Sequence, residues 1–143
     1  MSSIPHGASA PRPIEAQGTA ILAAIGAWTI VVPFLGTALG LSVNVRTIIE
    51  VVDHVVPGAI VVLVGLLLHA RARRRSLASD GTSLLAAGVG FLAGFWVLAT
   101  HVPLLADAAR SALPWDAAIW HSIAALPMLG VALWCVLRAM PDP

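Results

Sequence analysis

Charged side chains are scarce in this sequence. Asp, Glu, Lys and Arg make up 10% of its 143 residues, whereas hydrophobic residues make up 59%. A soluble domain needs a charged surface, in which roughly a quarter to a third of the residues carry charge. With a mean hydropathy of +0.92, most of the apolar side chains must face something other than water. The composition therefore excludes a water-soluble domain and indicates an integral membrane protein.

Lysine is absent, and Cys135 is the single cysteine. One cysteine excludes an intrachain disulfide and a cysteine metal cluster, and its place in an apolar run predicts a small buried side chain. The net charge of +1 provides no basic field that would favour nucleic-acid binding. The sequence contains no serine-nucleophile motif, phosphate-binding loop or dinucleotide fingerprint. It therefore favours a role other than catalysis.

Four long apolar stretches predict the fold, because a helix of about 20 residues crosses the roughly 30 Å hydrocarbon core of a bilayer. We expect helices over residues 19–41, 47–70, 84–100 and 116–140. The predicted fold is all-α: an integral membrane bundle of four transmembrane helices, built as two tandem helix pairs over residues 19–70 and 84–140. Residues 1–18 are expected to form a flexible cytoplasmic tail, and residues 71–83 a basic cytoplasmic loop.

The arginines predict an orientation in the membrane. With four spans, Arg12, Arg138 and the arginine cluster after the second span fall on one side, and Arg46 and Arg110 fall on the other. The arginine cluster consists of Arg71, Arg73, Arg74 and Arg75. Because basic residues concentrate in cytoplasmic loops, we expect a multi-pass protein of the cell (inner) membrane with both termini in the cytoplasm. The cluster could bind anionic lipid headgroups, or it could serve the topology alone.

The two halves of the chain resemble each other. In the second helix of each half, a histidine near the start precedes an arginine near the end, and His54 and Arg71 have the same spacing as His121 and Arg138. This agreement favours an internal repeat of one helix pair. The halves also open alike, with Ile21-Leu22-Ala23-Ala24 in the first and Leu84-Leu85-Ala86-Ala87 in the second.

Two short motifs in the first half suggest a family. Val32-Pro33-Phe34 follows Gly26-Ala27-Trp28 in the first expected helix, and Asp53-His54-Val55-Val56-Pro57-Gly58-Ala59 lies early in the second. This arrangement resembles the SPW-repeat integral membrane proteins, which are built from such helix pairs. Val32-Pro33-Phe34 stands where that family has Ser-Pro-Trp and retains only the proline, and the second half has Phe95-Trp96 in the corresponding region. The resemblance implies a membrane architecture and no particular biochemical activity.

A group of polar residues lies near the start of the second helix. Glu50, Asp53, His54 and Pro57 follow one another at i, i+3, i+4 and i+7, so they share one helical face. Glu50 and Asp53 are therefore candidate metal ligands, or could orient the imidazole of His54. The alternative is a headgroup-level helix start, where acidic side chains favour the positive end of the helix dipole.

The histidines offer a second candidate site. His54 and His121 occupy equivalent places in the two halves, and His101 is expected at the same level of the membrane. Imidazoles on facing helices are what b-type haem or a divalent metal ion requires. The alternative is three separate interfacial histidines, each satisfied by water or backbone.

Three roles are compatible with these patterns. The first is an accessory or structural subunit, without a cofactor, that packs in the lipid bilayer against a larger membrane complex or against its own copies. The second is a haem- or metal-binding redox protein that uses His54, His121 and His101. The third is a small oligomeric transporter, which would need polar groups at mid-membrane. The scarcity of such groups makes the first role the preferred prediction.

Overall fold

The structure is a computed structural model that describes residues 13–40, 47–74, 76–79 and 81–140. These residues form helices and their connections, with no strand among them. Four segments are long and apolar enough to cross a membrane: Pro13–Gly36, Ile48–Ala72, Gly81–Ala109 and Trp115–Ala139. The predicted all-α architecture of four membrane-spanning helices is therefore confirmed.

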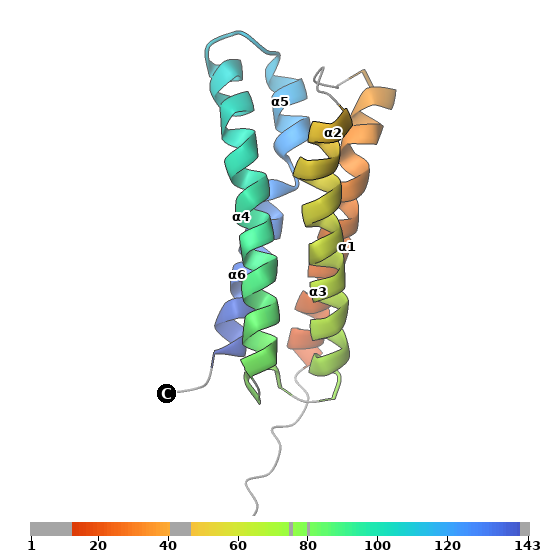
Figure 1. Ribbon diagram of the computed structural model, residues 1–143, viewed down its shortest axis with the longest axis vertical. Helices are drawn as coiled ribbons and strands as arrows, with labels where there is room; N and C mark the ends of the chain where they lie inside the picture. Colours follow the sequence, from red (N-terminus) through yellow and green to blue (C-terminus); the bar gives the residue numbers. More distant parts are fainter. Residues whose placement is uncertain (1–12, 41–46, 75, 80, 141–143) are drawn as a thin grey trace, which may run out of the picture.

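The helices lie side by side along the long axis of the molecule (Figure 1). In chain order they are α1 (Pro13–Ala38), α2 (Thr47–Glu50), the π-helix η1 (Val51–Val55), α3 (Val56–Ala72), the 3₁₀ turn η2 (Leu77–Ser79), α4 (Gly81–Ala109), α5 (Trp115–Ser122) and α6 (Ala125–Ala139). The connection from α4 to α5 lies at the upper end in Figure 1. The connection from α3 to α4 lies at the lower end, together with the start of α1 and the end of α6.

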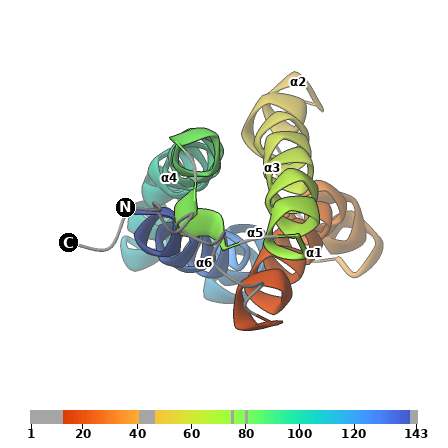
Figure 2. The same ribbon diagram turned by 90° about the horizontal axis from the view of Figure 1, so that it is seen from below.

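The packing follows the two halves of the chain. The most extensive contacts join α1 to α3 and α4 to α6, and these two pairs then meet through α3 with α4 and α1 with α6. Figure 2 shows the two pairs from below. This is the arrangement expected of two tandem helix pairs.

Glycines bring the backbones of α1 and α3 together. A Cβ atom at Gly65 would lie 2.6 Å from the backbone nitrogen of Ala23, and one at Gly26 would lie 2.8 Å from the carbonyl oxygen of Gly58. No side chain fits at these distances, so each glycine permits a close helix approach of the kind common in membranes. Large apolar side chains such as Leu63, Leu85 and Leu126 instead point outward and are exposed, as expected where the surroundings are lipid.

Two helix ends lie elsewhere than the sequence analysis placed them. α1 begins at Pro13, so residues 13–18 are helical rather than part of a tail. Proline suits the first turn of a helix, and Glu15 in that turn is buried and accepts a hydrogen bond from the backbone N–H of Leu77 at 2.9 Å. α4 continues to Ala109 with Pro103 inside it, because a membrane helix tolerates a proline when neighbouring groups satisfy the freed carbonyl.

The second and fourth spans are interrupted beside their prolines. η1 is a five-residue π-helix immediately before Val56 and Pro57, and the fourth span breaks between α5 and α6, shortly before Pro127. Proline lacks the N–H that continues the helical hydrogen-bond ladder, and a widened π turn is one way in which a helix accommodates the loss. Residues 1–12, Arg46 and Arg75, on which part of the predicted topology depends, lie outside the described residues.

Candidate functional site

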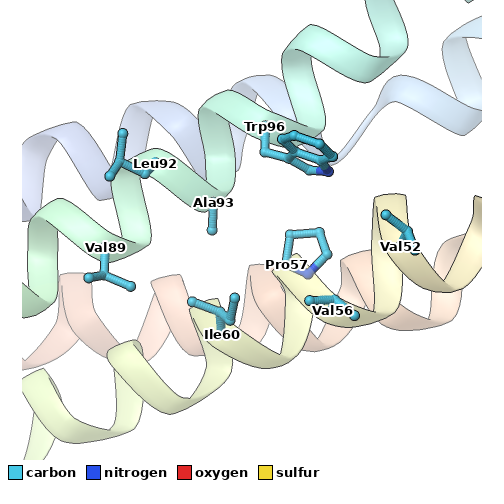
Figure 3. Close-up of a pocket in the computed structure, with 8 residues that line it drawn as sticks. All are labelled: Val52, Val56, Pro57, Ile60, Val89, Leu92, Ala93 and Trp96. Atoms are coloured by element: carbon cyan, nitrogen blue, oxygen red, sulfur yellow. The ribbon is translucent and has the colours of Figure 1, made fainter.

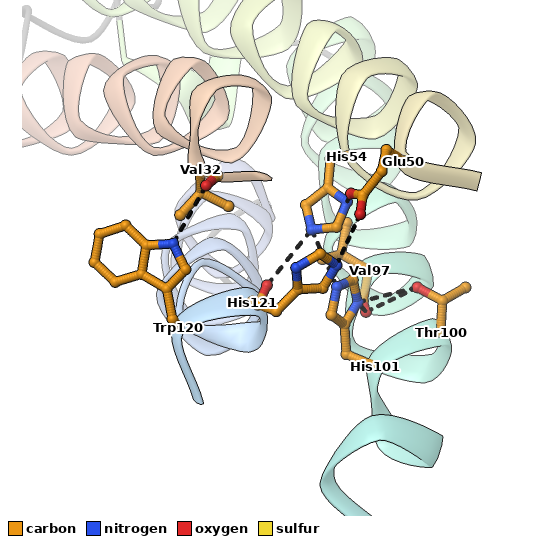
Figure 4. Close-up of polar contacts among 8 residues, drawn as sticks. All are labelled: Val32, Glu50, His54, Val97, Thr100, His101, Trp120 and His121. Atoms are coloured by element: carbon orange, nitrogen blue, oxygen red, sulfur yellow. Dashed lines mark hydrogen bonds and ion pairs between the residues drawn. The ribbon is translucent and has the colours of Figure 1, made fainter. Parts of the chain in front are cut away.

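Three histidines from three helices meet in the upper part of the bundle. His54 comes from η1, His101 from α4 and His121 from α5, and their side chains are only 1%, 1% and 5% exposed. One ring nitrogen from each lies within 4.8 Å of the others. We call these three residues the histidine cluster (Figure 4). Because all three side chains are buried and close together, they are not separate side chains in contact with water.

The helix irregularities and small residues position the cluster. His54 lies within the π turn of η1, and His121 lies in the last turn of α5, just before the break in the fourth span. Gly94 allows α4 to approach α6, since a Cβ atom there would lie 3.1 Å from Cα of Leu129. Trp120 then fixes α5 against α1, because its indole N–H donates to the carbonyl oxygen of Val32 at 3.3 Å.

The three rings are close enough to share one small ion. The Nε2 atoms of His54 and His101 are 3.1 Å apart. The ring centroid of His54 lies 4.7 Å from that of His101 and 4.6 Å from that of His121. Two imidazole nitrogens bound to one tetrahedral zinc ion at 2.0–2.1 Å would be separated by about 3.3 Å. The His54–His101 pair therefore already has nearly the spacing that such an ion requires.

Hydrogen bonding fixes the tautomer of His101. Its Nδ1 lies 2.6 Å from the carbonyl oxygen of Val97, and since a carbonyl can only accept, Nδ1 carries the hydrogen. In the neutral ring the Nε2 atom then bears a lone pair, and this atom faces His54. A histidine that ligates a metal commonly donates its second N–H to a backbone carbonyl in this way. The hydroxyl of Thr100 donates to the same carbonyl at 3.1 Å.

With Glu50 ionised, neither tautomer of neutral His54 satisfies all of its neighbours. If Nδ1 carries the hydrogen, the lone pair on Nε2 faces the lone pair of His101 at 3.1 Å. If Nε2 carries it, this atom can donate to His101 or to the backbone carbonyl of His121 at 3.5 Å, but the lone pair on Nδ1 then faces the carboxylate of Glu50, whose Oε2 is 3.2 Å away. Either choice leaves two acceptors in contact in a buried place, which is costly. An additional proton or a bound cation between the facing groups removes the conflict.

Glu50 completes the polar group. Its Oε2 approaches Nδ1 of His54, and its Oε1 lies 3.5 Å from Nε2 of His121. The contact with His54 is within ion-pair distance, yet Oε2 and Nδ1 are both buried and lack a hydrogen-bond partner of acceptable geometry. The side chain is 14% exposed. Glu50 thus places a carboxylate beside two imidazoles, as the spacing of Glu50 and His54 predicted.

A small cavity of about 120 Å³ adjoins the cluster. Asp53 contributes to its wall, so the second predicted acidic ligand lies near the histidines. Among the described residues that line this cavity, the charged side chains other than histidine are both acidic. We call it the histidine cavity, and its lining residues are Ile49, Glu50, Asp53, His54, Thr100, His101, Pro103, Leu104 and His121.

The structure brings together His54, His101, His121 and Glu50, all of which the sequence analysis selected. His69 lies far along α3, where its Nδ1 donates to the carbonyl oxygen of Ala16 at 2.8 Å. Val97 and Thr100 were not predicted from the sequence, although Val97 precedes His101 by one helical turn, the spacing at which a side chain can reach a backbone carbonyl.

The arginine cluster lies at the opposite end of the bundle. Arg71 is half-buried at the end of α3, and Arg73 and Arg74 are exposed just beyond it; Arg75 lies outside the described residues. Lipid binding by these arginines stays a prediction.

The described fold and site define a small multi-pass membrane protein with a buried histidine cluster. Comparison of the chain with protein-family models, curated proteins and solved structures finds no match. The resemblance to the SPW-repeat proteins therefore stays a prediction that rests on the motifs in the first half of the chain.

Proposed function

We propose that this membrane protein binds one divalent transition metal ion through His54, His101 and His121, with Glu50 as a fourth ligand or as the group that orients the imidazoles. The observation that supports this proposal is the conflict at His54, whose two ring nitrogens face a lone pair and a carboxylate. A divalent cation between the Nε2 atoms of His54 and His101 would replace their repulsive contact with two coordination bonds, and Nδ1 of His54 would then carry the hydrogen and face Glu50 as a donor. The cation also compensates the charge of a carboxylate held within a membrane span.

The geometry favours a single ion over haem. The cluster rings are 4.6–5.3 Å apart by their centroids, and a porphyrin between two axial histidines would need open space far wider than this. The histidine cavity, at about 120 Å³, is also well below the roughly 300 Å³ at which pockets for organic ligands begin. Haem is therefore the weaker of the two cofactors that the sequence suggested.

The donor set favours zinc among the divalent metals. Three imidazole nitrogens and an optional carboxylate oxygen are typical of zinc sites, and an incomplete protein ligand set leaves a position for water or a ligand. Imidazole also binds copper, nickel and iron, so the metal content must be measured. Zinc does not change oxidation state, so the proposed role is metal binding rather than electron transfer. The accessory-subunit and transporter roles stay predictions.

The test is the metal content of protein purified in detergent without a polyhistidine tag. We expect about one zinc ion per chain by mass spectrometry after exposure to zinc and removal of excess metal. His101→Ala should lose the stoichiometric metal, whereas His69→Ala should retain it, because His69 lies outside the cluster. Circular dichroism of both variants distinguishes loss of the site from loss of the fold. A metal-free wild type after zinc loading, or a fully loaded His101→Ala variant, would contradict the proposal.

A further inference from the structure

An apolar groove runs along the outside of the bundle between α3 and α4, below the histidine cluster. Its volume is about 370 Å³, and almost all of the surface that lines it is apolar. Ala93 and Pro57 leave space between the helices, and Trp96 faces Pro57 across the opening (Figure 3). The lining residues are Val52, Val56, Pro57, Ile60, Val89, Leu92, Ala93 and Trp96.

One end of the groove lies where α3 and α4 come into close contact, and the other end lies near the histidine cavity. At the first end Val64 reaches α4, where a Cβ atom at Gly90 would lie 3.1 Å from its Cγ1. At the other end Val52 adjoins Asp53, and Trp96 precedes Thr100 by four residues on α4; Asp53 and Thr100 both line the histidine cavity. Residues four apart on a helix are neighbours on one face. The apolar groove therefore ends about one helical turn from the polar cavity.

We propose that the groove holds the hydrocarbon chain of a single-chain membrane amphiphile whose uncharged, oxygen-bearing head group reaches the metal ion. This inference rests on the proposed function, because the metal supplies the polar partner for the head group. With Glu50 orienting the imidazoles rather than binding the ion, the open position of the three-histidine zinc site accepts an oxygen ligand. An alcohol, ester or amide of a long hydrocarbon chain has the required chemistry.

Charge balance favours a neutral head group. Glu50 and Asp53 both line the histidine cavity, and together they compensate the two positive charges of the bound ion. A phosphate or carboxylate head would add negative charge beside Asp53 with no further described cation on the cavity wall. In a buried place such an uncompensated charge is expensive. A neutral oxygen donor fills the metal's open position without this cost.

The dimensions favour a hydrocarbon chain over a helix of a partner protein. Val52 and Ile60 are eight residues apart, so the groove extends about 12 Å along α3 at 1.5 Å per residue. A partner helix would lie against the bundle along most of the roughly 30 Å hydrocarbon core, whereas α3 and α4 come into close contact at Val64 and Gly90 part of the way along. A flexible chain that enters from the surrounding lipid fits such a short groove.

The experiment uses two variants at exposed apolar positions. Val89→Phe fills the groove between α3 and α4. Ile21→Phe makes the same kind of change in a second groove, of about 360 Å³, between α1 and the fourth span. The residues that line this second groove are apolar and include no member of the histidine cluster. The first probe is a long-chain primary alcohol with a diazirine at its far end, added to protein in lipid nanodiscs and activated by light.

We expect crosslinks to residues that line the groove in the wild type and in Ile21→Phe, and their loss in Val89→Phe. This readout does not need a metal, so it tests the groove even if the proposed metal site fails. Even labelling of all lipid-facing helices, or labelling that Val89→Phe leaves unchanged, would overturn the inference. So would a wild type that is dimeric where Val89→Phe is monomeric, because the groove would then hold a second copy of the chain.

The second readout tests whether the head group reaches the metal. In cobalt-loaded protein the same alcohol without the diazirine should shift the visible absorption of cobalt, while an alkane of equal length should not. Val89→Phe should keep its cobalt and lose the shift. Crosslinking in the groove without any cobalt shift would refute the placement of the head group, and failure to bind cobalt or zinc at all would refute the proposed function instead.

Discussion

Glu50 and His121 are in contact across the interface between the two halves of the chain, with Oε1 of the carboxylate 3.5 Å from Nε2 of the imidazole. Glu50 belongs to the short helix that opens the second span, and His121 to the helix that opens the fourth. A carboxylate from one half thus faces an imidazole from the other inside the bundle. This contact makes the site a property of the assembled pair of halves and not of either half alone.

Substitution of this carboxylate should weaken metal binding. Glu50→Gln keeps the size of the side chain and removes its charge, so we expect the affinity for zinc to fall by about 10- to 100-fold, the range found when partners of metal ligands are removed. Competition with a fluorescent zinc chelator measures the change. Asp116→Asn is the matched control, because Asp116 is an exposed acidic residue at the same end of the bundle. Equal affinities of Glu50→Gln and the wild type would exclude Glu50 from the site.

His54 and His121 should act as one unit. Their ring centroids are 4.6 Å apart, so removal of either imidazole should abolish the increase in unfolding temperature that zinc gives the wild type through preferential binding to the folded state. His54→Ala, His121→Ala and the double variant should then show the same absence of a zinc effect. Two independent sites would instead give partial effects that add in the double variant.

The packing of α1 on α3 should depend on Gly65. Gly65→Ala places a methyl group 2.6 Å from the backbone nitrogen of Ala23, so the helices must separate. We expect a destabilisation of about 1–3 kcal/mol, as for overpacked cores, seen as unfolding at lower denaturant concentration. Gly88→Ala is the control, because a Cβ atom there meets nothing within 4 Å, and helix propensity alone should make this change neutral or stabilising by up to about 1 kcal/mol.

Cysteine labelling tests the orientation that the arginines predict. Thr82, near the start of α4, and Ala112, in the connection from α4 to α5, are exposed, and Figure 1 shows these two segments at opposite ends of the bundle. The native Cys135 is fully buried, so it should contribute little background. In intact cells a membrane-impermeant maleimide should label Ala112→Cys and not Thr82→Cys, whereas both should react after permeabilisation. The reverse pattern would show that the arginine cluster lies outside the cytoplasm, contrary to the positive-inside rule.

Hydropathy was sufficient to predict the four spans, because a bilayer requires long apolar helices whatever their sequence details. It could not locate the start of α1. The turn that contains Glu15 is held by a hydrogen bond from Leu77, 62 residues further along the chain. The composition near the N-terminus cannot predict a contact with so distant a residue. The π turn at η1 was also not predicted, because Pro57 indicates an irregular helix but not the kind of irregularity.

The site was predictable in its members and not in its chemistry. The equal spacing of His54 and His121 from their arginines placed them at one level, and the four-residue separation of Glu50 from His54 placed a carboxylate beside an imidazole. The decisive feature, the lack of a tautomer of neutral His54 that suits both His101 and an ionised Glu50, depends on the 2.6 Å bond from His101 to Val97. It also depends on the closeness of the two Nε2 atoms. Such relationships arise only when the helices are packed.

The buried carboxylate of Glu15 has a consequence for biogenesis. Its partner, the backbone N–H of Leu77, belongs to the connection that precedes the third span, so a ribosome must translate the whole first helix pair before this hydrogen bond can form. A nascent chain that contains the first two spans alone lacks this hydrogen bond. The start of α1 and the connection into the second pair are therefore joined only after both have been synthesised, so this contact couples the folding of the two halves.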